Sequence, residues 1–102
     1  MRRGAVYNHP RFPERRFAVV SAPEVANLGT VILADIDSVA PEGTSGLLAV
    51  TLTDDDPVSG AVMVHHLSYF SVGRLGDCFG HLSPETMDGV DYALRSALAL
   101  GH

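Results

Sequence analysis

Short apolar runs, each interrupted after a few residues, are the feature that most limits how this chain can fold. The runs are rich in β-branched residues, and proline, glycine and aspartate separate them. Runs of this kind predict β-strands. The predicted strands cover residues 4–7, 16–21, 30–36, 47–52 and 61–66, and residues 67–72 continue the last of them or pair beside it. The predicted connections are loops at 8–14 and 38–46, a short helical turn at 22–29 and a turn-rich segment at 73–80.

Helical periodicity is clearest in the C-terminal segment. Ser83 suits the N-cap of a helix, and Pro84 suits its first position. Apolar residues then recur at spacings of three and four, which places them on one helical face: Met87, Val90, Leu94, Ala97 and Leu98. We therefore predict one helix over residues 84–99, with Asp91 and Arg95 paired on its polar side.

Five or six strands followed by one helix define the expected fold class. The pattern predicts a mainly β chain, as a small antiparallel β-barrel or a strongly bent sheet closed by the C-terminal helix. A chain of 102 residues is long enough for one hydrophobic core and too short for two, so residues 1–102 are expected to form a single domain.

Charge is unevenly distributed along the chain. All seven basic residues are arginines, and the formal net charge is −5. Residues 1–16 hold five arginines and one acid, whereas residues 17–102 hold two arginines and eleven acids, so the local net charges are +4 and −9. The basic end predicts either an anion-binding edge or a solvated basic terminus, and composition leaves both open.

Composition excludes several classes of protein. With 46% hydrophobic and 19% charged residues, the chain is globular rather than disordered. No apolar run approaches the roughly 20 residues that span a bilayer, and no apolar segment follows the first arginines as a signal peptide requires. The single cysteine, Cys78, leaves no internal disulfide and no cysteine-rich zinc site, so we expect a cytoplasmic protein.

Two polar groups at predicted strand ends are candidate sites. Glu14, Arg15 and Arg16 enter the second strand, where arginine offers bidentate contacts to phosphate and the carboxylate can take a proton. Asp37 and Ser38 close the third strand. Each group can equally be structural, as an ion pair on a sheet edge or as a turn.

Three further features carry weaker chemistry. His65 and His66 are adjacent on a predicted strand, so they are expected to point to opposite faces, which disfavours a shared metal ion and favours one of them as a general acid or base. The aspartates at 54–56 predict a solvated turn. Cys78 has no basic neighbour within two residues, so we expect a semi-buried small residue rather than a nucleophile.

Several segments together resemble the MazF/PemK/Kid toxins. The chain begins with an Arg-Gly-aliphatic-aromatic strand at residues 3–7, and the second strand at 16–21 begins with arginine and ends in Val-Val-Ser. The strand at 30–36 is similar to the central strand of that family. Residues 74–76 and 80–94 are similar to its closing turn and C-terminal helix. The likeness runs in order along nearly the whole chain.

The resemblance implies both a fold and an activity. The fold is a small SH3-like, CcdB-type antiparallel β-barrel with a C-terminal α-helix, assembled as a homodimer. The proteins are toxins of type II toxin–antitoxin systems, which cleave single-stranded RNA without a metal or other cofactor and are neutralised by a cognate antitoxin. Such cleavage needs a base for the 2′-OH proton, an acid for the leaving oxygen and cations for the phosphorane charge.

The catalytic arginine of the family falls on Arg16, although Phe17 follows it where the family has proline. The loop before it is shorter than in the family, so Glu14 is the acid left to act there. The Thr or Ser that follows the third strand in the family aligns with Asp37, and Ser38 is one place further on. The acidic residue of a later strand in the family aligns with His65. The resemblance therefore implies that an imidazole does the acid–base work there in place of a carboxylate.

Three other arginines are implied as contacts to RNA phosphates, and they are Arg11, Arg15 and Arg74. The departures from the family leave two alternatives open. One is a CcdB-like toxin that poisons DNA gyrase, although the chain lacks tryptophan and the Trp-Gly-Ile terminus of CcdB. The other is a toxin-fold binding module without catalytic activity.

Overall fold

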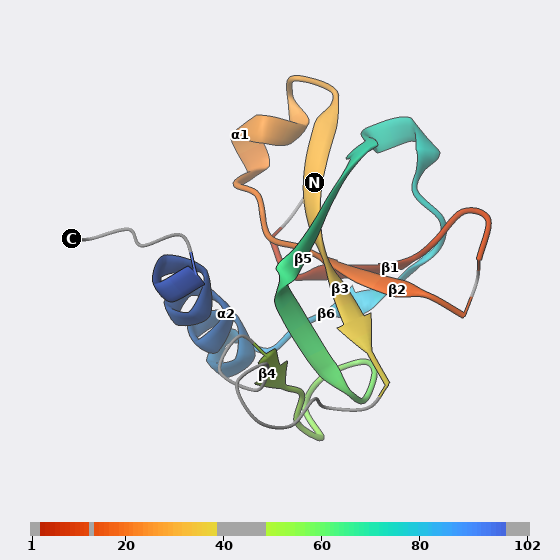
Figure 1. Ribbon diagram of the computed structural model, residues 1–102. Helices are drawn as coiled ribbons and strands as arrows, with labels where there is room; N and C mark the ends of the chain where they lie inside the picture. The colour runs from red at the N-terminus through yellow and green to blue at the C-terminus, as the bar shows by residue number, and fades with distance from the viewer. Residues whose placement is uncertain (1–2, 13, 39–48, 98–102) are drawn as a thin grey trace.

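The computed structural model describes residues 3–12, 14–38 and 49–97, in which one curled antiparallel sheet is accompanied by a long C-terminal helix (Figure 1). The sheet has six strands in the order β4-β5-β3-β2-β1-β6. The strands are β1 (Ala5–Asn8), β2 (Arg16–Val19), β3 (Thr30–Asp37), β4 (Ala49–Thr51), β5 (Ala61–Ser71) and β6 (Cys78–His81). The helices are α1 (Pro23–Ala26), the 3₁₀ turn η2 (Val72–Arg74) and α2 (Pro84–Ala97).

The sheet forms a half-barrel, because β3 and β5 run steeply across β1 and β2 (Figure 1). Side chains alternate between its two faces along β2. Phe17 and Val19 belong to a core with Val31 and Leu33 of β3, while Ala18 belongs to a second core on the other face. The predicted mainly β fold with a C-terminal helix is confirmed.

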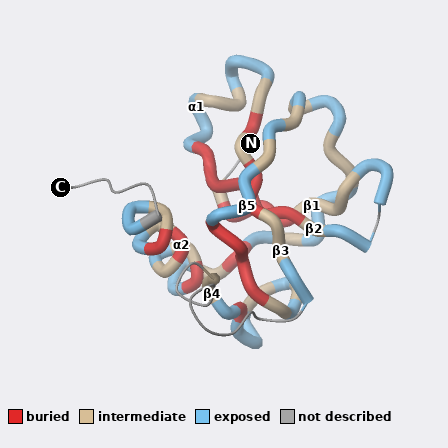
Figure 2. The backbone as a smooth tube through the Cα atoms, in the orientation of Figure 1, coloured by how far each residue is buried: buried red, intermediate tan, exposed pale blue. Residues whose placement is uncertain are grey.

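The second core lies where α2 covers the sheet. Val90 and Ala93 of α2 pack there with Val62 and Val64 of β5, and Val62, Val64 and Val90 are almost completely buried. In Figure 2 the lower part of β5 and parts of α2 are accordingly coloured as buried, as are segments of β1 and β2. Burial of these aliphatic side chains supplies the main stabilisation of the fold.

The predicted strands are found with three differences. Residues 67–72 do not form a separate strand, since β5 runs without a break to Ser71. The segment 73–80, predicted as a connection, contains most of β6, a four-residue strand held by its pairing with β1. Residues 39–48, most of the predicted loop at 38–46 and the first part of the strand at 47–52, lie outside the described residues.

A wide irregularity interrupts β5 where it pairs with β3. Ala34 pairs with Leu67, whereas the next residue, Asp35, pairs with Met63, so three residues of β5 have no counterpart on β3. Such bulges bend a strand and redirect its side chains. The expectation that His65 and His66 point to opposite faces is therefore wrong, because regular alternation fails inside the bulge. Both are exposed and their ring centroids are 4.1 Å apart.

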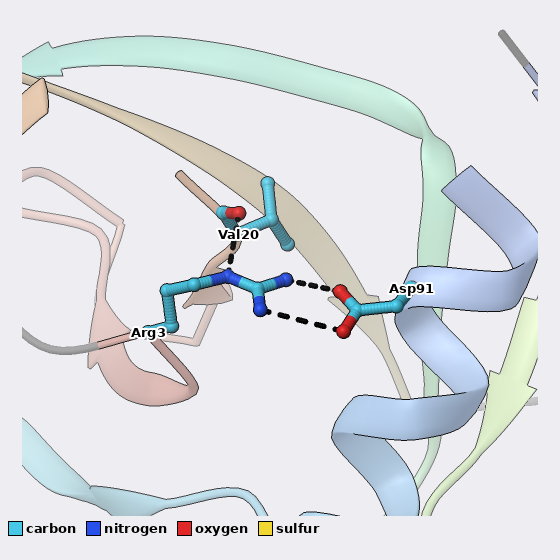
Figure 3. Close-up of polar contacts among 3 residues, drawn as sticks. All are labelled: Arg3, Val20 and Asp91. Atoms are coloured by element: carbon cyan, nitrogen blue, oxygen red, sulfur yellow. Dashed lines mark hydrogen bonds and ion pairs between the residues drawn. The ribbon is translucent and has the colours of Figure 1, made fainter. Parts of the chain in front are cut away.

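An arginine connects the chain start to α2. The Arg3 Nε donates to the Val20 carbonyl at 3.1 Å, and the guanidinium makes a two-pronged ion pair with the Asp91 carboxylate (Figure 3). The predicted pair of Asp91 with Arg95 is not formed among the described residues. Asp91 instead fixes the helix against the sheet, because tertiary packing brings Arg3 to it.

A hydrogen-bonded turn begins α2. The Ser83 hydroxyl accepts from the Thr86 amide at 3.2 Å, which confirms Ser83 as the N-cap. Asp56 accepts from the Ser83 amide at 2.8 Å, the Thr86 hydroxyl at 2.7 Å and the Thr53 amide at 2.7 Å. The acidic turn at 54–56 is thus more than a solvated turn, since Asp56 joins it to the helix.

These hydrogen bonds lower the pKa of Asp56. Burial alone would raise the pKa of Asp56. The amides of Thr53 and Ser83 and the hydroxyls of Thr86 and Thr53 all favour the ionised carboxylate, and together they outweigh the effect of burial.

No helix among the described residues is long and apolar enough to cross a membrane.

Candidate functional site

A polar pocket of about 270 Å³ lies where the start of β2 meets the end of β3. Its lining combines charged, hydroxyl and imidazole groups: Glu14, Arg15, Arg16, Asp35, Ile36, Asp37, Ser38, Ser59, Met63 and His66. Five of the eight residues predicted as site residues line it, namely Glu14, Arg15, Arg16, Asp37 and Ser38. Antiparallel pairing explains this, because Arg16 pairs with Ile36 and so brings the two predicted polar groups together.

A glycine holds the far wall of the pocket close to the end of β3. Gly60 has a φ of +123°, and a Cβ atom there would collide with the carbonyl of Asp37. Only glycine allows this close approach. It places Ser59 at the end of β3 and lets β5 begin beside Asp37, which pairs with Ala61.

The loop before β2 is short and closed by its own hydrogen bonds. The His9 amide donates to the Arg15 carbonyl at 2.8 Å, and the Arg15 amide donates to the Phe12 carbonyl at 2.9 Å. The His9 Nδ1 accepts from the amides of Arg11 and Phe12. These bonds bring the chain back to β2 and place Glu14, which is exposed, at the rim of the pocket.

The two adjacent arginines have different partners. Arg15 lies 3.5 Å from the Asp35 carboxylate and 5.4 Å from the centroid of the Phe17 ring, and its side chain is about half exposed. Arg16 places its guanidinium 4.8 Å from the centroid of the Phe79 ring. Arg15 is therefore ion-paired with Asp35, whereas Arg16 has no carboxylate within ion-pair distance among the described residues.

Two buried polar atoms in this pocket lack a hydrogen-bond partner among the described residues. They are the Nε of Arg16 and the Oδ1 of Asp35. Buried polar atoms are nearly always paired, and unpaired ones are costly. Such atoms on pocket-lining side chains therefore call for an explanation, and a bound ligand, water or ion supplies one.

His66, and not His65, lines the pocket. The bulge in β5 carries both imidazoles, and the ring of His65 lies against that of His66. The imidazole in the pocket is therefore that of His66, and not that of His65, which the resemblance suggested. An imidazole can both accept and donate a proton, so His66 is suited to proton transfer at this position.

The other predicted RNA contacts lie elsewhere. Arg11 is exposed in the loop after β1, and Arg74 is exposed in η2, and neither lines the pocket.

Cys78 is exposed rather than semi-buried, because it lies on the edge strand β6. Its presence beside Tyr7 adds to the effect of burial in raising the pKa of that phenol.

Besides His66, sequence reasoning missed four lining residues: Asp35, Ile36, Ser59 and Met63. It also missed Phe79, whose ring lies against the Arg16 guanidinium. Asp35 was the one charged residue within the most apolar predicted strand, which is a signal for a functional group. No local pattern marks Ser59 or Phe79, because each reaches the site through strand pairing. Among the described residues, no group of three or more His, Cys, Asp or Glu side chains is arranged to hold a metal ion.

Solved structures with this fold include proteins described as endoribonucleases and MazE–MazF complexes. A structure described as an endoribonuclease from a mycobacterial species is 24% identical, with a TM-score of 0.86 over 98% of this chain and 92% of the other. A second, described as an endoribonuclease in complex with its cognate antitoxin and also mycobacterial, is 23% identical, with a TM-score of 0.82 over 98% and 96%. A MazE–MazF complex from Deinococcus radiodurans is 20% identical, with a TM-score of 0.78 over 97% and 96%. At these identities the likeness establishes the fold.

The fold is therefore that of MazF-like toxins. A search of curated proteins finds no significant match to the sequence. The family model of the PemK-like, MazF-like toxins of type II toxin–antitoxin systems matches residues 6–98. The chain belongs to this family.

Proposed function

We propose that this toxin is an endoribonuclease that cleaves single-stranded RNA in the pocket between β2 and β3. The observation that carries the proposal is the convergence of Glu14, Arg16 and His66 on one pocket, in a chain of the PemK-like, MazF-like family. Together they supply a carboxylate, a guanidinium and an imidazole. These are the groups that proton transfer and phosphorane stabilisation require.

Arg16 is the proposed phosphate ligand. Among the described residues, no carboxylate lies within ion-pair distance of its guanidinium, and its Nε has no protein acceptor. A guanidinium in this state can bind a non-bridging oxygen and stabilise the negative charge that develops as the 2′-oxygen attacks phosphorus. Arg15 is paired with Asp35 and is proposed to bind a neighbouring phosphate.

Proton transfer is assigned to Glu14 and His66. One of them takes the proton of the attacking 2′-OH, and the other gives a proton to the leaving 5′-oxygen, so the reaction leaves a 2′,3′-cyclic phosphate and a free 5′-OH. Ser38 is a hydroxyl donor at the rim. Asp37 is anionic and would repel a phosphate placed beside it, so the scissile phosphate is proposed to bind on the arginine side of the pocket.

The charge of the molecule favours a short single-stranded substrate. Phosphate binding depends on cations that displace counterions, and the chain as a whole carries a formal net charge of −5. The two arginines of the pocket can serve two phosphates. A few nucleotides in the pocket thus suit this surface better than a long duplex.

The test is cleavage of defined single-stranded RNAs by the purified protein in EDTA. We expect cyclic-phosphate products, and Arg16→Ala is expected to reduce kcat by about 10²–10³, the usual loss for a group that stabilises developing charge. Arg95→Ala removes an equal charge from the exposed last turn of α2 and should leave activity unchanged. Induced expression should arrest growth with the wild type and not with Arg16→Ala.

Absence of cleavage by a folded wild type would overturn the proposal. The alternative of a gyrase poison predicts binding to gyrase and DNA breaks instead. The matching family is that of the PemK-like, MazF-like toxins, which favours RNA cleavage.

The proposed partners are a second copy of the chain and a cognate antitoxin, and the proposed place of action is the cytoplasm. Solved relatives of this fold are described in complex with a cognate antitoxin and as MazE–MazF assemblies, which supports the antitoxin. Sedimentation at micromolar concentration tests the homodimer. A monomer there would contradict it.

A further inference from the structure

The residue next to Arg16 in space comes from the far edge of the sheet. Phe79 lies on β6, and β6 is separated from β2 by β1. Val6 pairs with Gly80 and Tyr7 pairs with Cys78, so Phe79 is the extra residue of a β-bulge. Gly80 supports the bulge with a φ of +141°, which disfavours other residues.

The bulge directs the ring toward the pocket arginine. Phe79 is absent from both hydrophobic cores, and it is 43% exposed. Its ring nevertheless lies 4.8 Å from the Arg16 guanidinium, within the range of a cation–π interaction. A bulge that turns a large aromatic side chain out of the core and onto one arginine calls for a functional reason.

An aromatic partner has a different effect from a carboxylate. A carboxylate orients a guanidinium but also offsets part of its charge, as Asp35 does in its ion pair with Arg15. A ring attracts the guanidinium through its face and leaves both its charge and its N–H groups available. Among the described residues, no carboxylate lies within ion-pair distance of Arg16, which agrees with this difference.

We propose that Phe79 is the positioning residue of Arg16: its ring holds the guanidinium in place for the scissile phosphate without consuming its charge. The inference rests on the proposed ribonuclease function. It predicts that Phe79 acts only through Arg16 and affects the chemical step more than binding of the RNA.

The test compares Phe79→Leu, which keeps the side chain apolar, with Phe79→Tyr, which keeps the ring. We expect Phe79→Leu to lower kcat about tenfold, as loss of a cation–π contact predicts, with KM changed less than about twofold. Phe79→Tyr should retain activity, and Tyr92→Leu on the exposed face of α2 is the matched control. In an Arg16→Ala background, Phe79→Leu should have no further effect.

Equal kcat values for the Leu and Tyr variants would overturn the inference, and so would an undiminished effect of Phe79→Leu in the Arg16→Ala background. NMR of the Arg16 Nε–H group provides a readout that does not need catalysis. Its resonance should be shifted upfield by the ring and return toward the free value in Phe79→Leu. If the wild type cleaves no RNA, the proposed function fails, and this shift still decides whether the ring holds the arginine.

Discussion

Two polar regions of this toxin differ in how fully their charged groups are hydrogen-bonded within the protein. At the start of α2, the Asp56 carboxylate accepts hydrogen bonds from two backbone amides and two hydroxyls, and nearby Arg3 pairs with Asp91. At the pocket between β2 and β3, buried atoms of Arg16 and Asp35 have no partner among the described residues.

The difference separates charges that stabilise the fold from charges held ready for a ligand. A satisfied network gains stability because each desolvated group is compensated within the protein. An unsatisfied pair of atoms is a cost to stability that a bound phosphate or hydroxyl can relieve. Mutations in the two regions should therefore affect different measurements.

The largest effect on stability is expected at Asp56. Asp56→Ala leaves two amides and two hydroxyls without their acceptor and should lower the free energy of unfolding by about 2 kcal/mol. Urea denaturation measures it. Asp54→Ala removes a carboxylate from the same turn at an exposed position and should change stability by less than about 0.5 kcal/mol. Equal losses in both variants would contradict a special role for Asp56.

The lowered pKa of Asp56 should make the free energy of unfolding depend on pH in the acid range. Because its pKa is lowered below the ordinary value of 3.8, the unfolded state binds the proton more readily than the folded state. The stabilisation is therefore present above pH 3.8 and is lost as the pH falls through the lower, folded-state pKa. Asp56→Asn should flatten this part of the stability–pH curve, and a wild-type slope that persists in the variant would refute the assignment.

A smaller effect is expected for the ion pair of Arg3 and Asp91. Both side chains are about one-third exposed, so solvent weakens the pair, but its two-pronged geometry strengthens it. A double-mutant cycle of Arg3→Ala and Asp91→Ala should give a coupling of about 0.5–1 kcal/mol. The same cycle with Arg95→Ala in place of Arg3→Ala should give none.

The smallest effect on stability is expected at Arg15. Its side chain is about half exposed, so Arg15→Ala should change unfolding free energy by less than about 0.5 kcal/mol. RNA affinity should nevertheless fall, and the slope of log K against log salt should decrease by about 0.7 for a lost phosphate contact on a single strand. An unchanged slope would remove Arg15 from the RNA interface and would weaken the contrast between the two regions.

Local patterns predicted much of the fold. Strand and helix periods, turn residues and the Ser83 cap act over a few residues, and the elements they predict within the described residues are largely found in the structure. The missed strand β6 is short, contains glycine and has no alternation, so only its pairing with β1 makes it a strand. The wrong orientation of His65 and His66 has a similar cause, because a bulge depends on two strands and is invisible in either alone.

The sequence by itself determined the class of this protein: short β-branched runs, one amphipathic helix and arginines beside the second strand, in the order of the toxin family. Tertiary structure alone decided which groups share the pocket. It brought Asp35 to Arg15, Phe79 to Arg16 and His66 rather than His65 to the lining. The physical reason is that periodicity fixes the face on which a side chain lies, whereas strand register and bulges fix which distant side chain it meets.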